Sequence, residues 1–316
     1  MPATDAIPRI LGNLEKVISG KRRVLRSVLT GFFAGGHLLI EDVPGIGKTI
    51  LARALARSVS GVFKRIQFTP DLLPTDVMGV SIYEPSTQKF AFKPGPLFAH
   101  ILLADEINRA TPKTQSSLLE AMAEEQVTVD GQTYGLPRPF FVIATQNPLE
   151  SQGTYPLPEA QLDRFLMKLR VGYPDQETEV KILNDQQLTH PIDSLQPVCT
   201  PQDILAVQDL VKRIHVSPEL LEYIVRVVAA TREHPDVHVG SSPRGSLGLR
   251  RASQAAAMQA DRDYVTPDDI KDCATPVLAH RLVLKHQALL EGKNGETVMK
   301  QVLRSVPVEE TEHARG

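Results

Sequence analysis

The stretch that decides the fold is Glu41-Asp42-Val43-Pro44-Gly45-Ile46-Gly47-Lys48-Thr49. It follows an apolar run at residues 37–41 that predicts a β-strand, and it precedes a segment, residues 48–58, that predicts a helix. A glycine-rich turn in this context lets backbone N–H groups point at phosphate oxygens, and the helix N-terminus adds its dipole. The strict pattern has glycine at position 42, where this chain has aspartate. The stretch predicts a phosphate-binding loop; the alternative is a purely structural strand–helix turn.

The whole loop is the expected nucleotide contact, and its last two side chains have separate roles. The Lys48 ammonium is expected to reach the β- and γ-phosphates, and the Thr49 hydroxyl is expected to ligate Mg²⁺. The predicted nucleotide-binding residues of the loop are Asp42, Val43, Pro44, Gly45, Ile46, Gly47, Lys48 and Thr49.

A second apolar run, residues 101–106 (ILLADE), ends in two acids. Ligands of α/β sheets bind at the carboxyl ends of the strands, where these acids would lie. We expect Asp105 in the Mg²⁺ shell, through water, and Glu106 to polarise the attacking water. A strand ending in solvated acids is the alternative, but the phosphate-binding loop upstream favours the catalytic interpretation.

A third strand end, residues 144–148 (ATQNP), brings an amide to the same edge. The Asn147 side chain is suited to orient the nucleophilic water beside the γ-phosphate. Asn-Pro is also ordinary turn chemistry, and this motif alone leaves the two interpretations open.

Composition limits the function classes. The chain has 316 residues, 42% of them hydrophobic, and a formal net charge of −2, which favours a two-domain globular protein and argues against binding nucleic acid by bulk charge. The apolar runs are too short to span a membrane, and the N-terminus lacks the apolar region of a secretory signal. Cys199 and Cys273 are widely separated, which indicates isolated thiols in a reducing compartment. We expect a cytoplasmic protein without a membrane span.

The chain divides into an α/β part and a helical part. Strands are expected at 37–41, 64–68, 101–105, 140–145 and 165–171, with a helix opening at Thr111-Pro112. Hairpins are expected at 80–92 and at 126–134, the latter around Asp130-Gly131. Beyond Pro174 strand-like runs vanish, and a hydroxyl residue followed by proline opens four helices, at Thr200-Pro201, Ser217-Pro218, Ser242-Pro243 and Thr266-Pro267. The predicted domains are residues 1–173 and 174–316.

Together the motifs carry a family resemblance. The loop, the Asp105-Glu106 pair, Asn147 and residues 162–165 (LDRF) resemble AAA+ ATPases. The segments EDVPGIGKT, ADEINRA, ATQNP and LPEAQLDRF are similar to the MoxR family, which also tends to have aspartate at the position of Asp42. The resemblance implies a P-loop AAA+ core, with a parallel sheet flanked by helices, and a C-terminal all-helical lid. It also implies ATP and Mg²⁺ as ligands.

Further residue roles follow only from this resemblance. Arg164 matches the arginine finger, which acts on a neighbouring subunit's site, and Arg244 matches the sensor 2 arginine. Within one subunit, Lys48 and Arg244 would supply positive charge to ATP in the cleft between core and lid. Arg164 paired inside its own subunit and Arg244 as a solvated surface residue are the alternatives. Arg109 either faces the adjoining subunit or forms an ion pair within its own.

The resemblance also assigns an adenine pocket and two inserts. Ile18 and Gly20 lie where the family packs its adenine pocket. Residues 76–95 match the helix-2 insert and 126–135 the pre-sensor 1 hairpin. Both inserts are expected to project from a ring, where substrate contact and plain surface decoration are the two interpretations.

The implied activity is ATP hydrolysis by a homo-oligomeric ring, a hexamer. By resemblance it drives chaperone-like remodelling or maturation of partner proteins, including metal-cofactor insertion, with a von Willebrand factor A domain protein as partner. The alternatives are a magnesium-chelatase-like ATPase subunit and a nucleic-acid motor of the minichromosome maintenance type. Near-neutral charge argues against the motor, and Glu106 with Arg164 argues against a nucleotide switch that barely hydrolyses.

Overall fold

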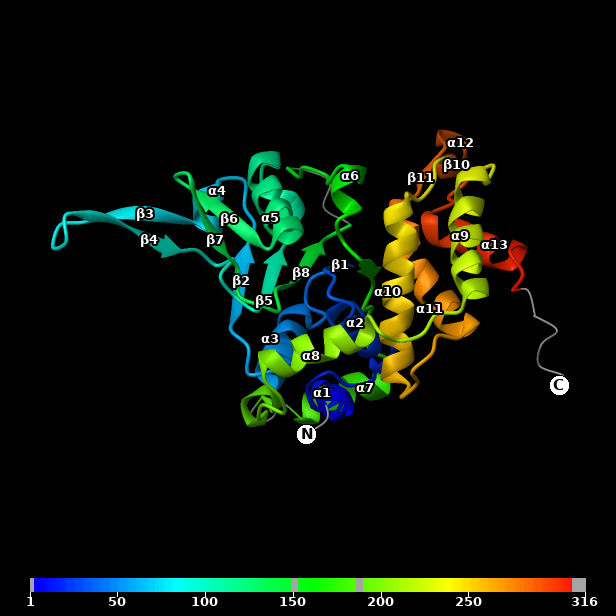
Figure 1. Cartoon of the computed structure of the whole chain (residues 1–316), viewed down its shortest axis with the longest axis horizontal. Helices are drawn as coiled ribbons and strands as arrows, with labels where there is room; N and C mark the ends of the chain where they lie inside the picture. The colour runs from blue at the N-terminus through cyan, green and yellow to red at the C-terminus, as the bar shows by residue number, and fades with distance from the viewer. Residues whose placement is uncertain (1–2, 149–152, 186–189, 309–316) are drawn as a thin grey trace.

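A five-stranded parallel sheet forms the centre of the molecule, in the order β2-β5-β8-β1-β9 (Figure 1). The computed structural model describes residues 3–148, 153–185 and 190–308. The strands are β1 (Leu38–Glu41), β2 (Phe63–Gln67), β5 (Ile101–Asp105), β8 (Phe141–Gln146) and β9 (Met167–Leu169). All five predicted strands are therefore present, and the prediction for residues 101–105 has the observed bounds.

Alternating residues of the central strands enter two separate cores. Leu38 and Ile40 of β1 belong to one apolar cluster, whereas Leu39 between them belongs to the other. The first cluster is completed by α1 (Ala6–Val17), α2 (Arg22–Phe33) and α3 (Lys48–Ser58), and the second by α4 (Pro74–Met78) and α5 (Pro112–Glu124). Burial on both faces explains the unbroken apolar runs of these strands.

The second half of the chain is helical (Figure 1). Its helices are α7 (Gln176–Asp185), α8 (Pro201–Val211), α9 (Pro218–Glu233), α10 (Pro243–Gln259), α11 (Pro267–Leu278), α12 (His286–Leu290) and α13 (Gly295–Ser305). One expectation was incomplete, because β10 (Val237–Val239) and β11 (Val283–Leu284) form a small antiparallel pair. Cys273 lies in this core as predicted, and burial raises the pKa of its thiol to about 12.

The four predicted helix starts are all present, at α8 to α11. The hydroxyls of Thr200, Ser217 and Ser242 accept backbone N–H groups of the first turn. At α8 and α11 an aspartate three residues on completes a capping box: the Thr266 hydroxyl and backbone N–H both donate to the Asp269 carboxylate (2.8 Å each), as those of Thr200 do to Asp203. Within the described residues no helix is long and apolar enough to cross a bilayer.

The chain packs back on the core before it enters the lid bundle. The Val198 N–H donates to the Ser58 carbonyl (2.8 Å), and the Arg57 guanidinium donates to the Ile192 carbonyl (2.7 Å). Gln208 of α8 donates to the carbonyl of Phe32 in α2 (2.8 Å). The boundary at residue 174 remains a prediction, and these contacts tie the segment that follows it to the core.

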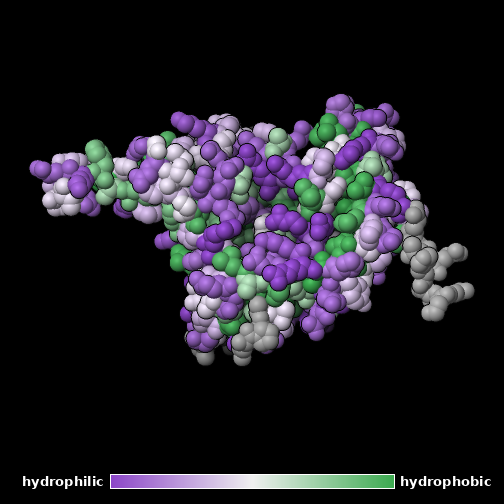
Figure 2. All heavy atoms as spheres, viewed as in Figure 1, coloured by the Kyte–Doolittle hydropathy of each residue, from purple (hydrophilic) through white to green (hydrophobic). Residues whose placement is uncertain are grey.

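Both predicted hairpins are present, and they touch each other. The long one, β3 (Gly79–Glu84) with β4 (Lys89–Pro94), projects away from the molecule, and the short one is β6 (Gln126–Val129) with β7 (Gln132–Gly135) (Figure 1). The Phe92 ring stacks on Tyr134 with centroids 4.0 Å apart. Figure 2 shows hydrophobic spheres along the projecting hairpin, whose exposed apolar residues are Val80, Ile82, Tyr83 and Phe90. These apolar side chains lie on the two strands, behind the polar turn at residues 85–88, and remain exposed in the described chain.

Candidate active site

The glycines of the phosphate-binding loop have the backbone conformation that the sequence predicts. Gly45 and Gly47 have φ angles of 86° and 88°, a left-handed region that residues with a Cβ adopt at a cost. Gly47 is the N-cap of α3, which begins at Lys48, so the free N–H groups of the helix face the loop. A Cβ at Gly47 would lie 3.7 Å from Ile18, which places Ile18 against the loop.

The loop forms one wall of a cleft of about 330 Å³. The cleft is lined by Pro44, Gly45, Gly47, Lys48, Thr49, Ile50, Arg65, Gln67, Asp105, Glu106 and Asn147. The strand ends of β5 and β8 therefore bring the two acids and the amide to the loop, as predicted. Among the described residues that line the cleft, none comes from the lid.

Asp42, where the strict loop pattern has glycine, accepts hydrogen bonds from three backbone N–H groups. One carboxylate oxygen accepts the N–H groups of Val171 (2.8 Å) and Gly172 (2.6 Å), and the other accepts the N–H of Val43 (3.0 Å). A glycine could accept none of these bonds with a side chain. The aspartate therefore ties the start of the phosphate-binding loop to the segment that follows β9.

The Lys48 ammonium is held inside the cleft. It donates to the backbone carbonyl of Asp42 (2.9 Å). Burial lowers the pKa of Lys48, and the charges of Asp105, Asp42 and Glu106 oppose this shift. The lysine is thereby aimed along the loop toward the two acids.

Thr145, fully buried in β8, joins Asp105 and Glu106. Its hydroxyl donates to one carboxylate oxygen of Asp105 (2.6 Å) and accepts the backbone N–H of Glu106 (2.9 Å). The backbone of Glu106 has a left-handed φ of 57°, a conformation that carries strain in a residue other than glycine. This turn separates the directions of the two carboxylates, so that adjacent residues can serve different roles.

The cleft residues fit a magnesium nucleotide by their chemistry. The Thr49 hydroxyl and the Asp105 carboxylate are oxygen donors, which Mg²⁺ prefers, and both line the cleft. Groups of three or more His, Cys, Asp or Glu that could hold a metal are absent from the described residues. This small donor set matches a cation that keeps several waters and shares the phosphates of its nucleotide.

The two predicted arginines lie together in a different cavity. Arg164 and Arg244 line a cavity of about 540 Å³ that also includes Asp163, Arg251 and Arg281; we call it the arginine pocket. Arg244 is thus not among the residues that line the Lys48 cleft of its own subunit, and its contribution of charge to ATP stays a prediction. The reason is that the start of α10 faces the core segment after α6 (Glu159–Leu162), where Arg244 pairs with Asp163 at 3.5 Å.

Comparisons with known proteins agree with this architecture. Residues 37–167 match the family described as "ATPase family associated with various cellular activities (AAA)", and residues 229–302 match an AAA lid domain. "Chaperone MoxR1" of Mycobacterium tuberculosis is 43% identical over 95% of this chain and 81% of its own length. The chain belongs to the MoxR family of AAA+ ATPases.

Two further relatives extend along almost the whole of this MoxR-family chain. The "Uncharacterized protein YeaC" of Bacillus subtilis is 52% identical over 94% of this chain and 92% of its own. The crystal structure of a "putative ATPase" from Cytophaga hutchinsonii has a TM-score of 0.91 and 38% identity, covering 98% of this chain and 96% of the other. The core and the lid are thus both shared with a solved structure.

The sequence pattern missed two polar partners of the acids in this MoxR-family site, Arg65 and Gln67, and left the partner of Arg109 open. Arg65 donates to the Asp105 carboxylate (2.7 Å), and Gln67 donates to the Glu106 carboxylate (2.7 Å). Arg109 pairs with the same Glu106 at 3.0 Å, which is the intrasubunit alternative for that residue. Arg65 and Gln67 read only as strand residues, because their role depends on the pairing of β2 with β5.

The two residues expected at the adenine pocket of this MoxR-family site, Ile18 and Gly20, lie outside the lining of the cleft. Ile18 contacts the loop at Gly47, as described above. Gly20 has a φ of 71°, and a Cβ there would come within 2.7 Å of the Thr178 hydroxyl of α7. Gly20 therefore permits a close approach of α7, and its part in an adenine pocket stays a prediction.

Proposed function

We propose that this protein hydrolyses ATP with Mg²⁺ as a homo-oligomeric ring, a hexamer, and uses the energy to remodel partner proteins. The observation that carries the proposal is the separation of the two halves of the site. The lining residues of the cleft all lie between Pro44 and Asn147, whereas Arg164 and Arg244 line the arginine pocket. A ring supplies the missing half, because the arginine pocket of one subunit can face the cleft of the next.

Within the cleft, each residue has a distinct task. The loop N–H groups and Lys48 hold the phosphates, and Thr49 with Asp105 would hold Mg²⁺, which neutralises phosphate charge when bound. Glu106 accepts a proton from the water that attacks the γ-phosphate in line, and Asn147 orients that water. The hydrogen bonds from Gln67 and Arg109 aim the Glu106 carboxylate.

Positive charge from the neighbouring subunit completes the reaction. Arg164 and Arg244 would stabilise the charge on the transferring phosphoryl group, a role that arginines fulfil in related phosphoryl transfers. Arg164 is held by the backbone carbonyl of Leu119, and Arg244 is largely exposed (61%). Placing Arg244 on the neighbour replaces our expectation that it acts within its own subunit.

We propose the projecting hairpin as the site of client contact. Phe90 is 74% exposed and packs edge-on against Tyr83, which gives an apolar surface near the tip suited to polypeptide side chains. The proposed clients are proteins that undergo maturation, including metal-cofactor insertion, with a von Willebrand factor A domain protein as partner. The relative named a chaperone supports remodelling as the general output.

Subunit mixing tests the proposed function. In Lys48→Ala subunits the affinity for ATP should fall by about 100-fold or more, because the phosphates lose their charge-assisted hydrogen bonds to the ammonium group. Arg164→Ala subunits should bind nucleotide normally and hydrolyse it slowly. Mixed together, the two should regain hydrolysis, because each Lys48→Ala subunit offers an intact Arg164 to a neighbour's cleft. Absence of rescue at every mixing ratio would overturn the trans arrangement.

The client proposal has its own test. Phe90→Ser should leave the basal ATPase rate unchanged and abolish stimulation by a von Willebrand factor A domain partner, measured with both proteins purified. The exposed Leu290 in α12 offers a matched control, because Leu290→Ser removes a comparable apolar side chain (76% exposed) from a surface far along the chain. Equal stimulation of Phe90→Ser and wild type would remove the hairpin tip from client binding.

A further inference from the structure

The lid sends one arginine deep into the core. Arg281 lies in η4 (Ala279–Arg281), directly after α11, and its side chain is only 3% exposed. The guanidinium donates to the Asp163 carboxylate (2.8 Å) and to the backbone carbonyls of Phe165 (2.7 Å) and Leu166 (3.2 Å). All three acceptors are close to Arg164 in the chain, so the lid is hydrogen-bonded to the segment that carries Arg164.

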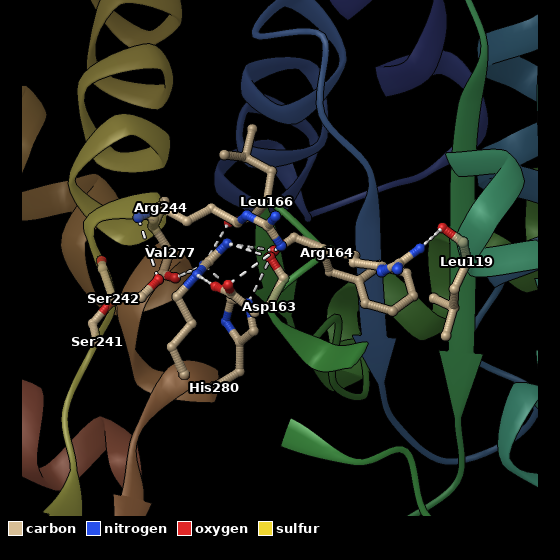
Figure 3. A network of polar contacts seen from close by, with 11 residues as sticks. Leu119, Asp163, Arg164, Leu166, Ser241, Ser242, Arg244, Val277 and His280 are labelled. Carbon is tan, nitrogen blue, oxygen red and sulfur yellow. Dashed lines mark hydrogen bonds and ion pairs between the residues drawn. The ribbon is translucent and has the colours of Figure 1, made fainter. Parts of the chain in front are cut away.

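Asp163 stands between a buried arginine and an exposed one. One carboxylate oxygen accepts from Arg281. The other faces Arg244 at 3.5 Å, and Figure 3 shows Asp163 and Arg244 side by side with Arg164. Burial lowers the pKa of Arg281, and the charge of Asp163 opposes that shift. A buried guanidinium is tolerated only when paired and hydrogen-bonded, and its rigid fork of donors holds several acceptors in one geometry. Arg281 thus satisfies Asp163, which leaves Arg244 with only a long, exposed ion pair.

We propose that Arg281 is a positioning residue for ATP hydrolysis: it neutralises Asp163 and fixes residues 163–166, so that Arg164 and Arg244 are available to a neighbouring subunit. The inference rests on the proposed function, in which these two arginines act in trans. Arg281 borders the arginine pocket, but its side chain is buried and its guanidinium is hydrogen-bonded to Asp163, Phe165 and Leu166 of its own subunit, so it acts through Arg164 and Arg244.

Loss of Arg281 has a defined consequence. Asp163 would then keep Arg244 as its paired cation and draw it inward, and the segment around Arg164 would lose its hydrogen bonds to the lid. Misplacement of a catalytic group by about 1 Å typically costs about 100-fold in rate. The residues that line the cleft of the same subunit make none of these contacts. The turnover number should therefore fall while the nucleotide affinity stays unchanged.

The test uses Arg281→Met subunits, alone and mixed with Lys48→Ala subunits. Alone, they should bind ATP with a Kd within about 2-fold of wild type and hydrolyse it about 10- to 100-fold more slowly. In an equal mixture, roughly a quarter of the interfaces join an intact cleft to an intact arginine pocket, so hydrolysis should rise to roughly a quarter of the wild-type rate. Restoration of charge balance by Asp163→Asn in the Arg281→Met background should also raise turnover above that of Arg281→Met alone.

Arg262→Met is the matched control. Arg262 is another lid arginine in a close ion pair, with both guanidinium nitrogens 2.7 Å from Asp269, and it lies outside the arginine pocket. Its loss should leave turnover unchanged in folded protein. If Arg281→Met does not fold, Arg281→Lys is tested in the same way, because lysine keeps the charge and lacks the fork.

The possible failures are distinguishable. If Arg164→Ala is not rescued by Lys48→Ala subunits, the trans arrangement itself fails. If Arg164→Ala is rescued but Arg281→Met turns over like wild type, the positioning role is overturned. The role is equally overturned if Arg281→Met loses nucleotide affinity or gains nothing from mixing, because Arg281 would then act only on the fold of its own subunit.

Discussion

The phosphate-binding cleft and the arginine pocket differ in how their charged side chains are paired. In the cleft, two cations, Lys48 and Arg65, face two acids, Asp105 and Glu106, and hydrogen bonds cross-link all four to neighbours. The arginine pocket gathers four arginines and three acids, Glu124, Glu125 and Asp163, and Asp163 pairs with two of the arginines. In the cleft, each acid is therefore paired within the α/β core. In the arginine pocket, arginines from the core and the lid lie side by side. In the proposed ring, the arginine pocket of one subunit completes the cleft of the next.

The largest expected effect breaks the cleft and leaves the pocket intact. Glu106→Gln removes the proton acceptor but keeps the hydrogen bond from Gln67, so ATP should bind normally while the turnover number falls about 10²- to 10⁴-fold. Steady-state ATPase rates and nucleotide titrations measure the two quantities. The exposed Glu233→Gln at the end of α9 is the control. Wild-type turnover in Glu106→Gln would remove this residue from its catalytic role.

Acidification should lower the free energy of unfolding through His37, a buried residue beside the arginine pocket. His37 lines the arginine pocket, accepts the Val142 N–H (3.1 Å) and lies 3.1 Å from the Met122 carbonyl. Burial lowers its pKa from 6.5 to about 4, with a smaller contribution from Arg251. Because the unfolded chain takes up the proton first as the pH falls below 6.5, the free energy of unfolding should fall between pH 6.5 and 4, by about 3 kcal/mol.

Urea unfolding at pH 7.5 and pH 4.5 measures this effect. His37→Gln keeps a donor and an acceptor but does not titrate, so its loss of stability between the two pH values should be smaller than that of wild type by about 2–3 kcal/mol. His238→Gln, at an exposed position in β10, should behave like wild type. Equal losses in wild type and His37→Gln would show that another group controls the acid sensitivity.

The smallest expected effect concerns Asp42, whose carboxylate holds the start of the phosphate-binding loop. Asp42→Gly creates the strict phosphate-binding pattern, yet it removes the acceptors for Val43, Val171 and Gly172. ATP affinity should fall about 3- to 10-fold, since a hydrogen bond contributes about 1 kcal/mol. Asp42→Asn, which keeps one acceptor oxygen, should be intermediate in calorimetric titrations. If Asp42→Gly binds ATP as tightly as wild type or more tightly, the Asp42 hydrogen bonds do not contribute to nucleotide binding.

Local patterns predicted what depends on neighbours in the chain. The Asp130-Gly131 turn and the hydroxyl-proline helix starts were correct because each is decided within a few residues. Arg65 escaped notice because its partner comes from β5, across a strand pairing that joins distant segments. Arg281 carried no signal at all, since a lone arginine among apolar residues is identified only by the carboxylate that it meets. The site's chemistry was thus readable in the motifs, whereas the support around it depended on long-range packing.

The stacked rings of Phe92 and Tyr134 give the projecting hairpin the mechanics of a lever. From the stack to the tip the strands run for about 13 Å, at roughly 3.3 Å per residue. A rotation of about 15° at this fulcrum would carry the tip through about 3.4 Å, which is the rise of one residue in an extended chain. If the hairpin rotates about this contact, the distance that its tip travels is set by the position of the two rings along the strands.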